Sequence, residues 1–502
     1  MWLILLTIVI ITVILSSKIF VDWSRPPLFP PGPPGLPFLY NIYDLKLLVR
    51  KTGSHGKAWC ELAKEYGAVV GLRLGLADPM IIVSGREAVM EMLGRSEFDG
   101  RPNGFIFTHR TMGEKRGILF TDGKVWADQR RFSLISLKSF GWAGQTMEEL
   151  ILEDAENLGK IIEKVSQEHE GIVQNLKELT ALAVLNSLWS LFGGSRYDIG
   201  KCEPKLLETL RMLNDSVKES NVSGGLLNYL PFLRLLAPKS SGYEAIHDRL
   251  LRMWAFFAEE VKSHKKTRKE GINRDLIDAY LEEIETRRNN PDSTFNEMQL
   301  IALLKDFFAA GVDTTNNSIG FTIGYLTLVP EVQDKVQEEL DRVIGKDNLP
   351  SLSTRNSLPY LNATLAEVLR LANIGPTTIP HRATKDTLLN GYVIKKNYTI
   401  LANLMSVHQD VDHWGDPEVF RPERFIDASG QFIPDAWVIP FGSGRRKCIG
   451  ETLAKNSHFL FIAYLLQKFK FALAPGQSRP SMTGMDGFAL APPIFKILIT
   501  KR

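Results

Sequence analysis

One short segment near the C-terminus constrains this chain more than any other: Phe441–Gly450, which reads FGSGRRKCIG. Its glycines suit a tight loop that turns with positive φ and lets the backbone approach a flat ligand closely. Three basic residues stand directly before Cys448, and the apolar run Leu453–Phe469 that follows predicts a buried helix. Positive charge and the N–H groups of a helix start favour a thiolate over a thiol. A thiolate held in this way is a good axial ligand for haem iron, where it favours cleavage of an O–O bond.

A lone cysteine before a core helix is more often just a buried residue, because free cysteine is commonly buried. Here the whole spacing follows F-x-x-G-x-R-x-C-x-G. The chain therefore resembles the cytochrome P450 family, over roughly its full length. The resemblance implies a mainly α-helical fold with small β-sheets (α+β). It also implies haem b held by the thiolate of Cys448, with Phe441 and Arg446 beside the haem.

The composition is that of a globular protein with a large core. The 502 residues are 44% hydrophobic and 23% charged, which is ordinary for a folded domain. A formal charge of +3 is too small to indicate a nucleic-acid partner. The three cysteines, Cys60, Cys202 and Cys448, are too few and too scattered for a disulfide framework, an iron–sulfur site or a zinc site, and they fit a reducing compartment.

Residues 1–22 predict a membrane anchor. Met1–Leu15 carries no charge, and Ile19–Val21 extends the apolar run to about twenty residues, the length that spans a bilayer. A cleaved signal peptide is the alternative, but no charged segment precedes the run and no small-residue cleavage pattern follows it. Lys18 and Arg25 follow the run, so the positive-inside rule places the rest of the chain in the cytosol. Together with the resemblance to microsomal members, this predicts the endoplasmic reticulum membrane.

Residues 23–39 form a proline-rich hinge, because so many prolines exclude a helix and favour stiff polyproline geometry. The catalytic domain is expected over 40–502, with no long linker and no internal repeat. Alternation and turn residues predict short strands at 69–74 and 80–83, and helical spacing dominates elsewhere, as at 147–165 and 206–217.

Phe295–Leu326 predicts a long helix that contains the sequence AGVDTT. The match is to the family's A-G-x-[DE]-T-T. Ala310 and Gly311 leave room for dioxygen. The hydroxyl of Thr314 can bond back to the carbonyl four residues earlier and open the helix to water. Asp313 can then deliver protons, as general acid catalysis requires. An N-capping D-T-T between two separate helices is the alternative.

Four positions outside the cysteine loop match the family's contacts to the haem propionates. Trp126 and Arg130 are four residues apart and share a helix face, and an indole N–H and a guanidinium can both donate to a carboxylate. Arg101 and His381 match further contacts. In isolation, a W-x-x-x-R pair or a single histidine is more often part of the core or the surface, so these roles rest on the resemblance.

Glu367 and Arg370 form an E-x-x-R pair, which on its own is commonly a solvated pair on a helix. The resemblance adds Arg424 as the third partner of a buried network that sets the cysteine loop. That role is structural, and loss of a helix partner is expected to cost haem as well as stability.

One turn departs from the family pattern G-Y-x-I-P-K-G. Lys395 replaces its proline and Asn397 its glycine. We expect a doubtful strand there, but a surviving turn, because asparagine tolerates the left-handed conformation.

The implied reaction is monooxygenation, in which one oxygen atom enters an apolar substrate and the other leaves as water. Asp313 and Thr314 are the implied proton donors. The sequence contains no flavin or nicotinamide fingerprint, so electrons come from NADPH through a separate NADPH–cytochrome P450 reductase, with cytochrome b5 as a second candidate donor. Lys138, Arg445 and Lys447 are a hypothesised docking face for the reductase.

The substrate side is expected to be apolar. The residues placed there are Phe105, Phe107, Ile118, Phe307, Phe308, Ala310, Ile374 and Phe488. The phrases Glu97–Pro102 and Gly450–Lys455 are similar to those of insect microsomal members that epoxidise methyl farnesoate in juvenile hormone synthesis. Members that act on fatty acids, steroids or foreign compounds are alternatives. A haem-thiolate hydroperoxide isomerase, which the Asp313–Thr314 pair disfavours, and a non-enzymatic haem binder are alternatives from other classes.

Overall fold

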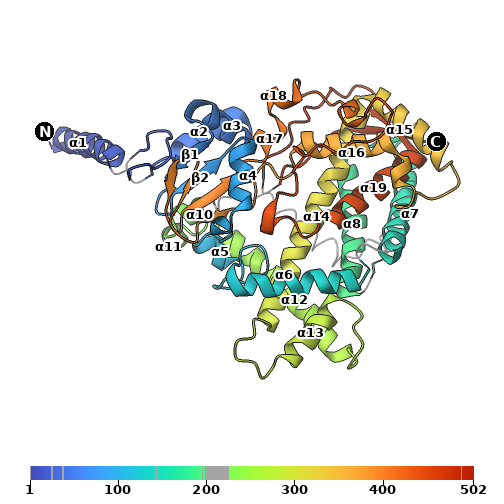
Figure 1. Cartoon of the computed structure of the whole chain (residues 1–502), viewed down its shortest axis with the longest axis horizontal. Coiled ribbons are helices and arrows are strands. Elements are labelled where there is room, and N and C mark those ends of the chain that lie inside the picture. Colours follow the sequence, from blue (N-terminus) through green and yellow to red (C-terminus); the bar gives the residue numbers. More distant parts are fainter. Residues whose placement is uncertain are drawn as a thin grey trace.

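The computed structural model describes residues 2–23, 26–36, 39–141, 145–194, 196–197, 225–487 and 489–502, and within the first helix the side chains of 5–14 and 16. Helices dominate and the sheets are small (Figure 1), so the predicted fold class is confirmed. The predicted helix at 206–217 lies outside the described residues.

Helix α14 (Glu297–Leu328) runs through the middle of the molecule (Figure 1). Asn296 caps its start by accepting a hydrogen bond from the Gln299 N–H, and Pro330 follows its end. Nearly every side is buried, against α8 (Leu176–Gly193), α12 (Tyr243–Thr267), α16 (Pro359–Ala372) and α19 (Glu451–Lys468). The helix is continuous through Asp313, so the predicted long helix is confirmed and the alternative of two helices is wrong.

A four-stranded sheet forms the second part of the body. Its order is β1 (Val69–Leu72), β2 (Met80–Val83), β7 (Thr399–Ala402) and β4 (His381–Arg382), with β2 and β7 parallel and the other pairs antiparallel. Alternate strand residues pack on α2 (Ile42–Thr52) and α3 (His55–Tyr66) on one face and on α4 (Arg86–Gly94) on the other. The two predicted strands are confirmed, and β4 fixes the backbone of His381.

The turn at Lys395–Asn397, whose sequence departs from the family pattern, forms as predicted. Strands β5 (Thr387–Leu389) and β6 (Tyr392–Ile394) pair antiparallel, and Asn397 adopts a left-handed φ of 76°. The doubtful strand is therefore present, and asparagine takes the conformation that glycine takes in the family pattern.

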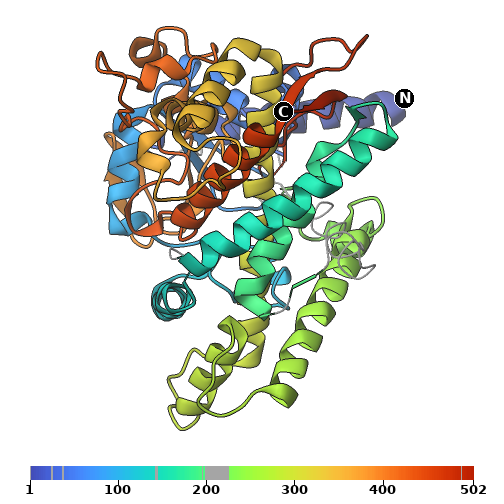
Figure 2. The same cartoon turned by 90° about the vertical axis from the view of Figure 1, so that its right-hand side faces the viewer.

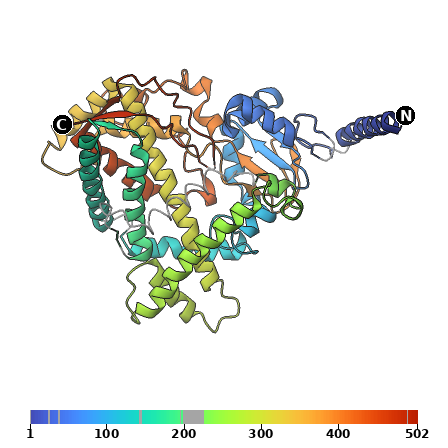
Figure 3. The same ribbon diagram turned by 180° about the vertical axis from the view of Figure 1, so that it is seen from behind.

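The remaining helices enclose this frame. Helices α7 (Gln145–Glu168) and α19 lie side by side (Figure 2), and α12 crosses α14 on the far side (Figure 3). A three-stranded sheet of β3 (Ile172–Val173), β9 (Ile497–Lys501) and β8 (Phe469–Leu473) lies near the C-terminus. The other helices are α5 (Phe105–His109), α6 (Gly123–Ser139), α10 (Gly225–Tyr229), α11 (Leu233–Leu236), α13 (Leu276–Thr286), α15 (Pro330–Val343), α17 (Met405–His408) and α18 (Val411–Trp414).

Helix α1 (Trp2–Trp23) points away from the body (Figure 1). In the part of the chain that the structure describes, no helix has the length and the apolar character needed to cross a membrane.

Candidate active site

A cavity of about 610 Å³ lies inside the body, with α14 and the cysteine loop both in its wall. Most of the residues that the sequence singles out come together there, although they are spread over about 350 positions of the chain. The predicted site residues that line it are Arg101, Phe107, Ile118, Trp126, Arg130, Phe307, Ala310, Asp313, Thr314, Ile374, His381, Phe441, Arg446 and Cys448.

The cysteine loop depends on its glycines. Gly442 and Gly444 have φ of 69° and 70°, and a Cβ on Gly444 would lie 2.0 Å from the carbonyl oxygen of Leu93. The loop therefore rests directly on the end of α4. The N–H of Cys448 donates to the carbonyl of Phe441 (3.0 Å), which closes the loop just before α19 begins.

The thiol of Cys448 differs from the sequence expectation. Its surroundings raise its pKa, chiefly through burial among protein atoms and secondarily through Glu451. The N–H of Gly450, Arg130 and Lys447 act in the opposite direction but do not prevail. One reason is that Lys447 is already paired with Glu451 (2.7 Å). Because the sulfur lies on the cavity wall, a bound metal can reach it, and metal coordination deprotonates a thiol outright.

A group of cations without matching anions faces the cavity. Arg101 is 4% exposed and donates to the carbonyls of Leu119 (2.8 Å), Ile379 (3.1 Å) and Pro380 (2.9 Å). No carboxylate among the described residues forms an ion pair with it. Burial, followed by the neighbouring Arg446, lowers the pKa of Arg101. The protein therefore holds positive charge here that a negatively charged ligand would compensate.

Arg446 carries an unused donor in the same place. Its Nε and Nη2 both donate to the carbonyl of Asp99, whereas its buried Nη1 has no hydrogen-bond partner among the described residues. Burial lowers the pKa of Arg446 to about 10. His381 donates from Nδ1 to the carbonyl of Phe98 (2.7 Å), and burial holds its pKa well below the usual range.

The indole of Trp126 lies among these cations. The guanidinium of Arg446 is 3.9 Å from its ring centroid, and those of Arg445 and Arg130 are 5.6 and 5.8 Å away. Arg130 also donates to the carbonyl of Lys447 (2.8 Å). These donors, the orphaned Nη1 and the cysteine on the same cavity suit a flat ligand with two carboxylates, so the residues present fit haem.

The predicted network behind the loop is present, with Glu367 and Arg370 fully buried and the side chain of Arg424 6% exposed. Arg370 donates to both carboxylate oxygens of Glu367 (2.7 and 2.8 Å), and Arg424 Nε and the N–H of Arg421 donate to Oε1 (3.3 and 3.0 Å). Arg424 also donates to the carbonyl of Trp414 (2.6 Å). The control of the cysteine loop by this network stays a prediction.

His408 connects that network with the loop, and the sequence did not reveal it. Its carbonyl accepts from Arg370 Nη1 (2.7 Å), its Nε2 accepts from the N–H of Ile439 (2.9 Å), and its Nδ1 donates to Asn373 (2.8 Å). The carbonyl of Ile439 in turn accepts from the N–H of Gly442 (3.0 Å). Burial lowers the pKa of His408 to about 3, so the imidazole is neutral. A buried histidine between two motifs carries no signal of its own in one sequence.

The oxygen side of the cavity is formed by α14. Thr314 Oγ1 donates to the carbonyl of Ala310 (2.6 Å), as predicted. Asp313 is buried, with its Oδ2 accepting from Asn317 (3.0 Å) and its Oδ1 3.8 Å from Lys177 Nζ. Both side chains line the cavity, one as a hydroxyl and one as a carboxylate.

Two predicted substrate residues lie outside the cavity lining, and a third is not among the described residues. Phe308 follows Phe307 on α14, and one residue turns a helix by roughly 100°. It therefore points into the core, where it packs on Trp189 and Phe257. Phe105 stacks on His109 outside the cavity lining. Phe488 lies outside the described residues.

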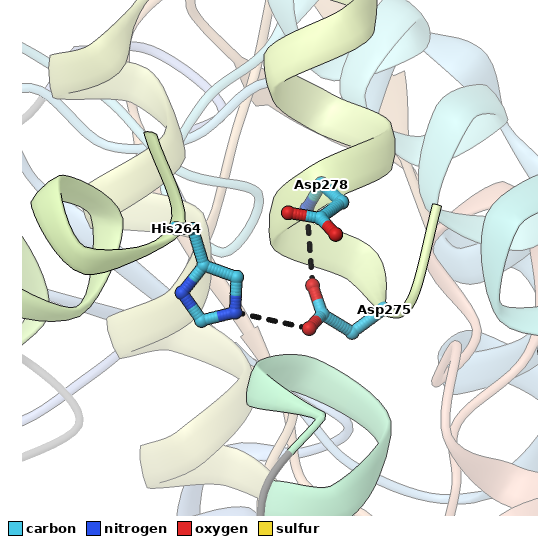
Figure 4. A group of neighbouring side chains, drawn as sticks. All are labelled: His264, Asp275 and Asp278. Atoms are coloured by element: carbon cyan, nitrogen blue, oxygen red, sulfur yellow. Dashed lines mark hydrogen bonds and ion pairs between the residues drawn. The ribbon is translucent and has the colours of Figure 1, made fainter. Parts of the chain in front are cut away.

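A second polar cluster, His264, Asp275 and Asp278 (Figure 4), joins the end of α12 to the start of α13. His264 Nδ1 faces the carbonyl of Glu260 (2.8 Å) and its Nε2 faces Asp275 (3.0 Å), so both nitrogens carry protons. Asp275 caps α13, and Asp278 takes two hydrogen bonds from Arg274. These side chains bond to one another and to Arg274, so the cluster has a structural role and joins α12 to α13.

The fold and the site define a haem-thiolate protein: one cysteine loop backed by a buried network, a cationic wall for two carboxylates and a hydroxyl-bearing helix opposite. The chain belongs to the cytochrome P450 family, because the family model "Cytochrome P450" matches residues 30–499. Members bind haem b through a cysteine thiolate, and the chain is a cytochrome P450 monooxygenase.

Relatives cover the whole chain. It is 34% identical to "Farnesoate epoxidase" of Bombyx mori over 499 residues, 99% of both chains. It is 36% identical to "Probable cytochrome P450 305a1" of Drosophila melanogaster over 510 residues, 99% of this chain and 98% of the relative. It is 33% identical to human "Cytochrome P450 2J2" over 477 residues, 94% of this chain and 91% of the relative.

Proposed function

We propose that this chain is a microsomal monooxygenase that epoxidises a farnesoate-type substrate, with methyl farnesoate and the free acid as the two candidates. The observation that carries the proposal is the similarity to a farnesoate epoxidase over 99% of both chains. The cavity supports it, because its wall away from the cysteine is largely apolar and includes Phe107, Phe192 and Phe307.

Haem supplies the oxygen chemistry, in which a thiolate ligand favours O–O cleavage; one oxygen atom enters the substrate and the other leaves as water. In this proposal Cys448 is the ligand. Arg101, Arg130, Arg446, Trp126 and His381 hold the propionates, with Phe441 beside the macrocycle. An anionic ligand would also restore a higher pKa to His381 by offsetting the neighbouring guanidinium groups.

Thr314 and Asp313 have separate tasks in proton delivery. The hydroxyl proton of Thr314 points to the carbonyl of Ala310, so its oxygen is left to accept a hydrogen bond from water on the cavity side. Asp313 lies one residue earlier, beside Lys177 of α8, whose side chain is partly exposed. Protons can therefore pass from the surface to Asp313 and then to water held by Thr314.

Electrons come from NADPH through cytochrome P450 reductase, with cytochrome b5 as a second donor. The side chains of Lys138, Arg445 and Lys447 are exposed on the cysteine side, and cationic patches of this kind act mainly on encounter rates. Arg445 and Lys447 are each paired with a carboxylate, Asp99 and Glu451, so their net field is weaker than their charges suggest. An unchanged salt dependence of reduction in Lys447→Glu would contradict this docking face.

We further propose that residues 1–22 anchor the chain in the endoplasmic reticulum membrane, with the body in the cytosol. The apolar side chains of α1 that the structure describes are exposed. A second apolar patch, Leu76, Phe232, Leu235 and Leu236, lies exposed on the same side of the body, where the N–H of Leu76 donates to the carbonyl of Tyr229. Exposed apolar patches of this kind mark interaction surfaces such as membranes. Recovery of a 1–22 deletion in the soluble fraction, with the full chain in the membrane pellet, would support the anchor.

The test of the substrate is direct. The membrane-bound protein is incubated with reductase, NADPH and each candidate, and products are identified by mass spectrometry. An epoxide from either compound supports the proposal. Unconverted substrate, from protein with a normal thiolate-type carbon monoxide spectrum, would contradict the substrate and leave the monooxygenase; oxidised fatty acids, steroids or foreign compounds would then identify the alternative.

A further inference from the structure

The far end of the cavity contains polar side chains that the proposed reaction does not use. Lys305, Arg110 and His109 all line it. Lys305 belongs to α14, His109 is the last residue of α5, and Arg110 follows it. In the sequence, Lys305 and Asp306 are the only charged residues between Glu297 and Asp313 of α14.

Asp306 forms its ion pair with Arg110 and not with Lys305. Its Oδ1 accepts from Arg110 Nη2, and its Oδ2 accepts from the N–H groups of Ile118 (2.8 Å) and Leu119 (3.0 Å). The carboxylate thus ties α14 to the loop before α6 and compensates the charge of Arg110. Lys305, Arg110 and Asp306 together therefore carry a net charge of about +1 when the lysine is protonated.

Lys305 also has spare donors. It is 8% exposed, and its ammonium group donates a single hydrogen bond, to the carbonyl of Arg110 (2.8 Å). An ammonium group has three N–H donors, so two are without a partner among the described residues. Burial lowers the pKa of Lys305 to about 7, as expected of an ammonium group held away from water without a counter-ion.

Two more polar atoms nearby are unsatisfied. Arg110 Nη1 and His109 Nε2 are buried and have no hydrogen-bond partner among the described residues. An unsatisfied buried polar group is costly, and native structures rarely leave several together without a ligand or an ordered water. The rings of Phe105, Tyr243 and His247 pack around His109, so its imidazole is fixed in place.

We propose that Lys305, supported by Arg110 and His109, forms a subsite for the acyl oxygen at one end of an extended apolar substrate. A carboxylate or an ester carbonyl supplies the required acceptor, and the carboxylate also matches the charge. The subsite deepens the proposed function, on which its link to farnesoate rests. On α14, Lys305 precedes Ala310 and Thr314 by five and nine residues, about 8 and 14 Å along the axis. A substrate held at Lys305 therefore presents a carbon far from its acyl group for oxidation.

The test compares the holoenzyme with Lys305→Met, which keeps an unbranched apolar side chain of similar volume, and with Lys305→Arg, which restores the donors. Lys470→Met, at an exposed position on β8, is the matched control. Two ligand series are titrated by equilibrium dialysis: farnesoic acid, methyl farnesoate and farnesene, and a fatty acid, its methyl ester and the alkane of equal length.

Lys305→Met is expected to weaken binding of the acids by about ten- to a hundredfold, because hydrogen bonds to charged groups have this strength. The esters are expected to weaken less, and the hydrocarbons to change by no more than about twofold. Lys305→Arg and Lys470→Met are expected to keep the preference for the acids. Equal changes in all three ligands of a series, or no change in any, would overturn the subsite.

Haem content is measured first. If Lys305→Met does not retain haem, Lys305→Gln, which keeps one donor, replaces it with the same criteria. The two series separate the subsite from the proposed function: a wild-type protein that prefers both acids through Lys305 but makes no epoxide supports the subsite and contradicts the farnesoate reaction. If Lys305→Met makes the same epoxide with unchanged substrate affinity, the farnesoate reaction is supported and the subsite is contradicted.

Discussion

The network behind the cysteine loop and the far end of the cavity treat buried polar groups in opposite ways. Behind the cysteine loop, both oxygens of Glu367 and both nitrogens of His408 have partners. At the far end, Lys305, Arg110 and His109 retain donors or acceptors without partners. Because a satisfied buried network is rigid and an unsatisfied one is costly, the network behind the loop is complete without a ligand, whereas the far end of the cavity is completed by its ligand.

The largest expected effect is that of a substitution at Glu367, in the network behind the loop. Glu367→Ala leaves Arg370 buried without its counter-ion, and removing one member of a buried pair costs roughly 3–5 kcal/mol. We expect a marked fall in thermal stability and loss of most bound haem, measured by thermal unfolding and by the absorbance of purified protein. Glu418→Ala, at an exposed position in the same region, is the control. Full haem content in Glu367→Ala would show that the network does not set the loop.

Thr314→Val tests the substrate side without disturbing the frame. Valine has the same shape but lacks the hydroxyl that bonds to Ala310 and holds the water of the proposed proton path, and positioned proton transfer contributes on the order of 10² or more in rate. We expect product formed per NADPH to fall by about that factor, with haem content unchanged. Equal coupling in the variant, measured from NADPH consumption and product yield, would remove Thr314 from proton delivery.

His408→Ala tests whether His408 transmits the position of the buried network to the cysteine loop. The N–H of Ile439 loses its acceptor, at a cost of roughly 1–3 kcal/mol, and the loop that follows is less firmly placed. We expect a smaller loss of stability than in Glu367→Ala and a mixed carbon monoxide spectrum that reports a loosened thiolate. His408→Gln, whose side-chain oxygen can accept the same hydrogen bond, should restore the spectrum. An unaltered spectrum in His408→Ala would leave this residue a merely packed histidine.

The smallest effect is expected away from the cavity, in the cluster of His264, Asp275 and Asp278 (Figure 4). The carboxylate of Asp275 raises the pKa of His264 above the usual value, against the opposing effect of burial. The stabilisation is therefore complete below about pH 6.5, the unfolded value, and is lost as the pH rises through the folded pKa. The carbonyl of Glu260 and the carboxylates of Asp275 and Asp278 act on this histidine, and Arg274 is paired with Asp278.

Melting temperatures of wild type and His264→Gln, measured from pH 6 to pH 9, check this sign. We expect the advantage of the wild type to shrink with rising pH by on the order of 1 °C, since a large chain shifts little per kcal/mol. A constant or growing advantage would mean that His264 is neutral in the folded protein.

The sequence predicted what short motifs and strong periodicity carry. The continuous α14 and the strands at 69 and 80 follow from local patterns, whereas the gathering of fourteen site residues around the cysteine loop is what the resemblance implies. The orientation of Phe308 was missed, because neighbouring aromatic residues on a helix are assigned to the cavity or the core only by tertiary packing. The raised pKa of the Cys448 thiol in the protein without haem was not predicted, because burial by residues distant in the sequence is its main cause. The roles of His408 and Lys305 were also missed, because their hydrogen-bond partners lie more than thirty and nearly two hundred residues away in the sequence.

One absorption titration tests the division between the two sides most directly. Wild type, His408→Ala and Lys305→Met are titrated with farnesoic acid and with farnesene, and the same spectra give haem content and the ratio of the two dissociation constants. We predict that His408→Ala lowers haem content and keeps the ratio in the protein that retains haem, whereas Lys305→Met keeps haem and collapses the ratio. A changed ratio in His408→Ala, or an unchanged one in Lys305→Met, would contradict the account.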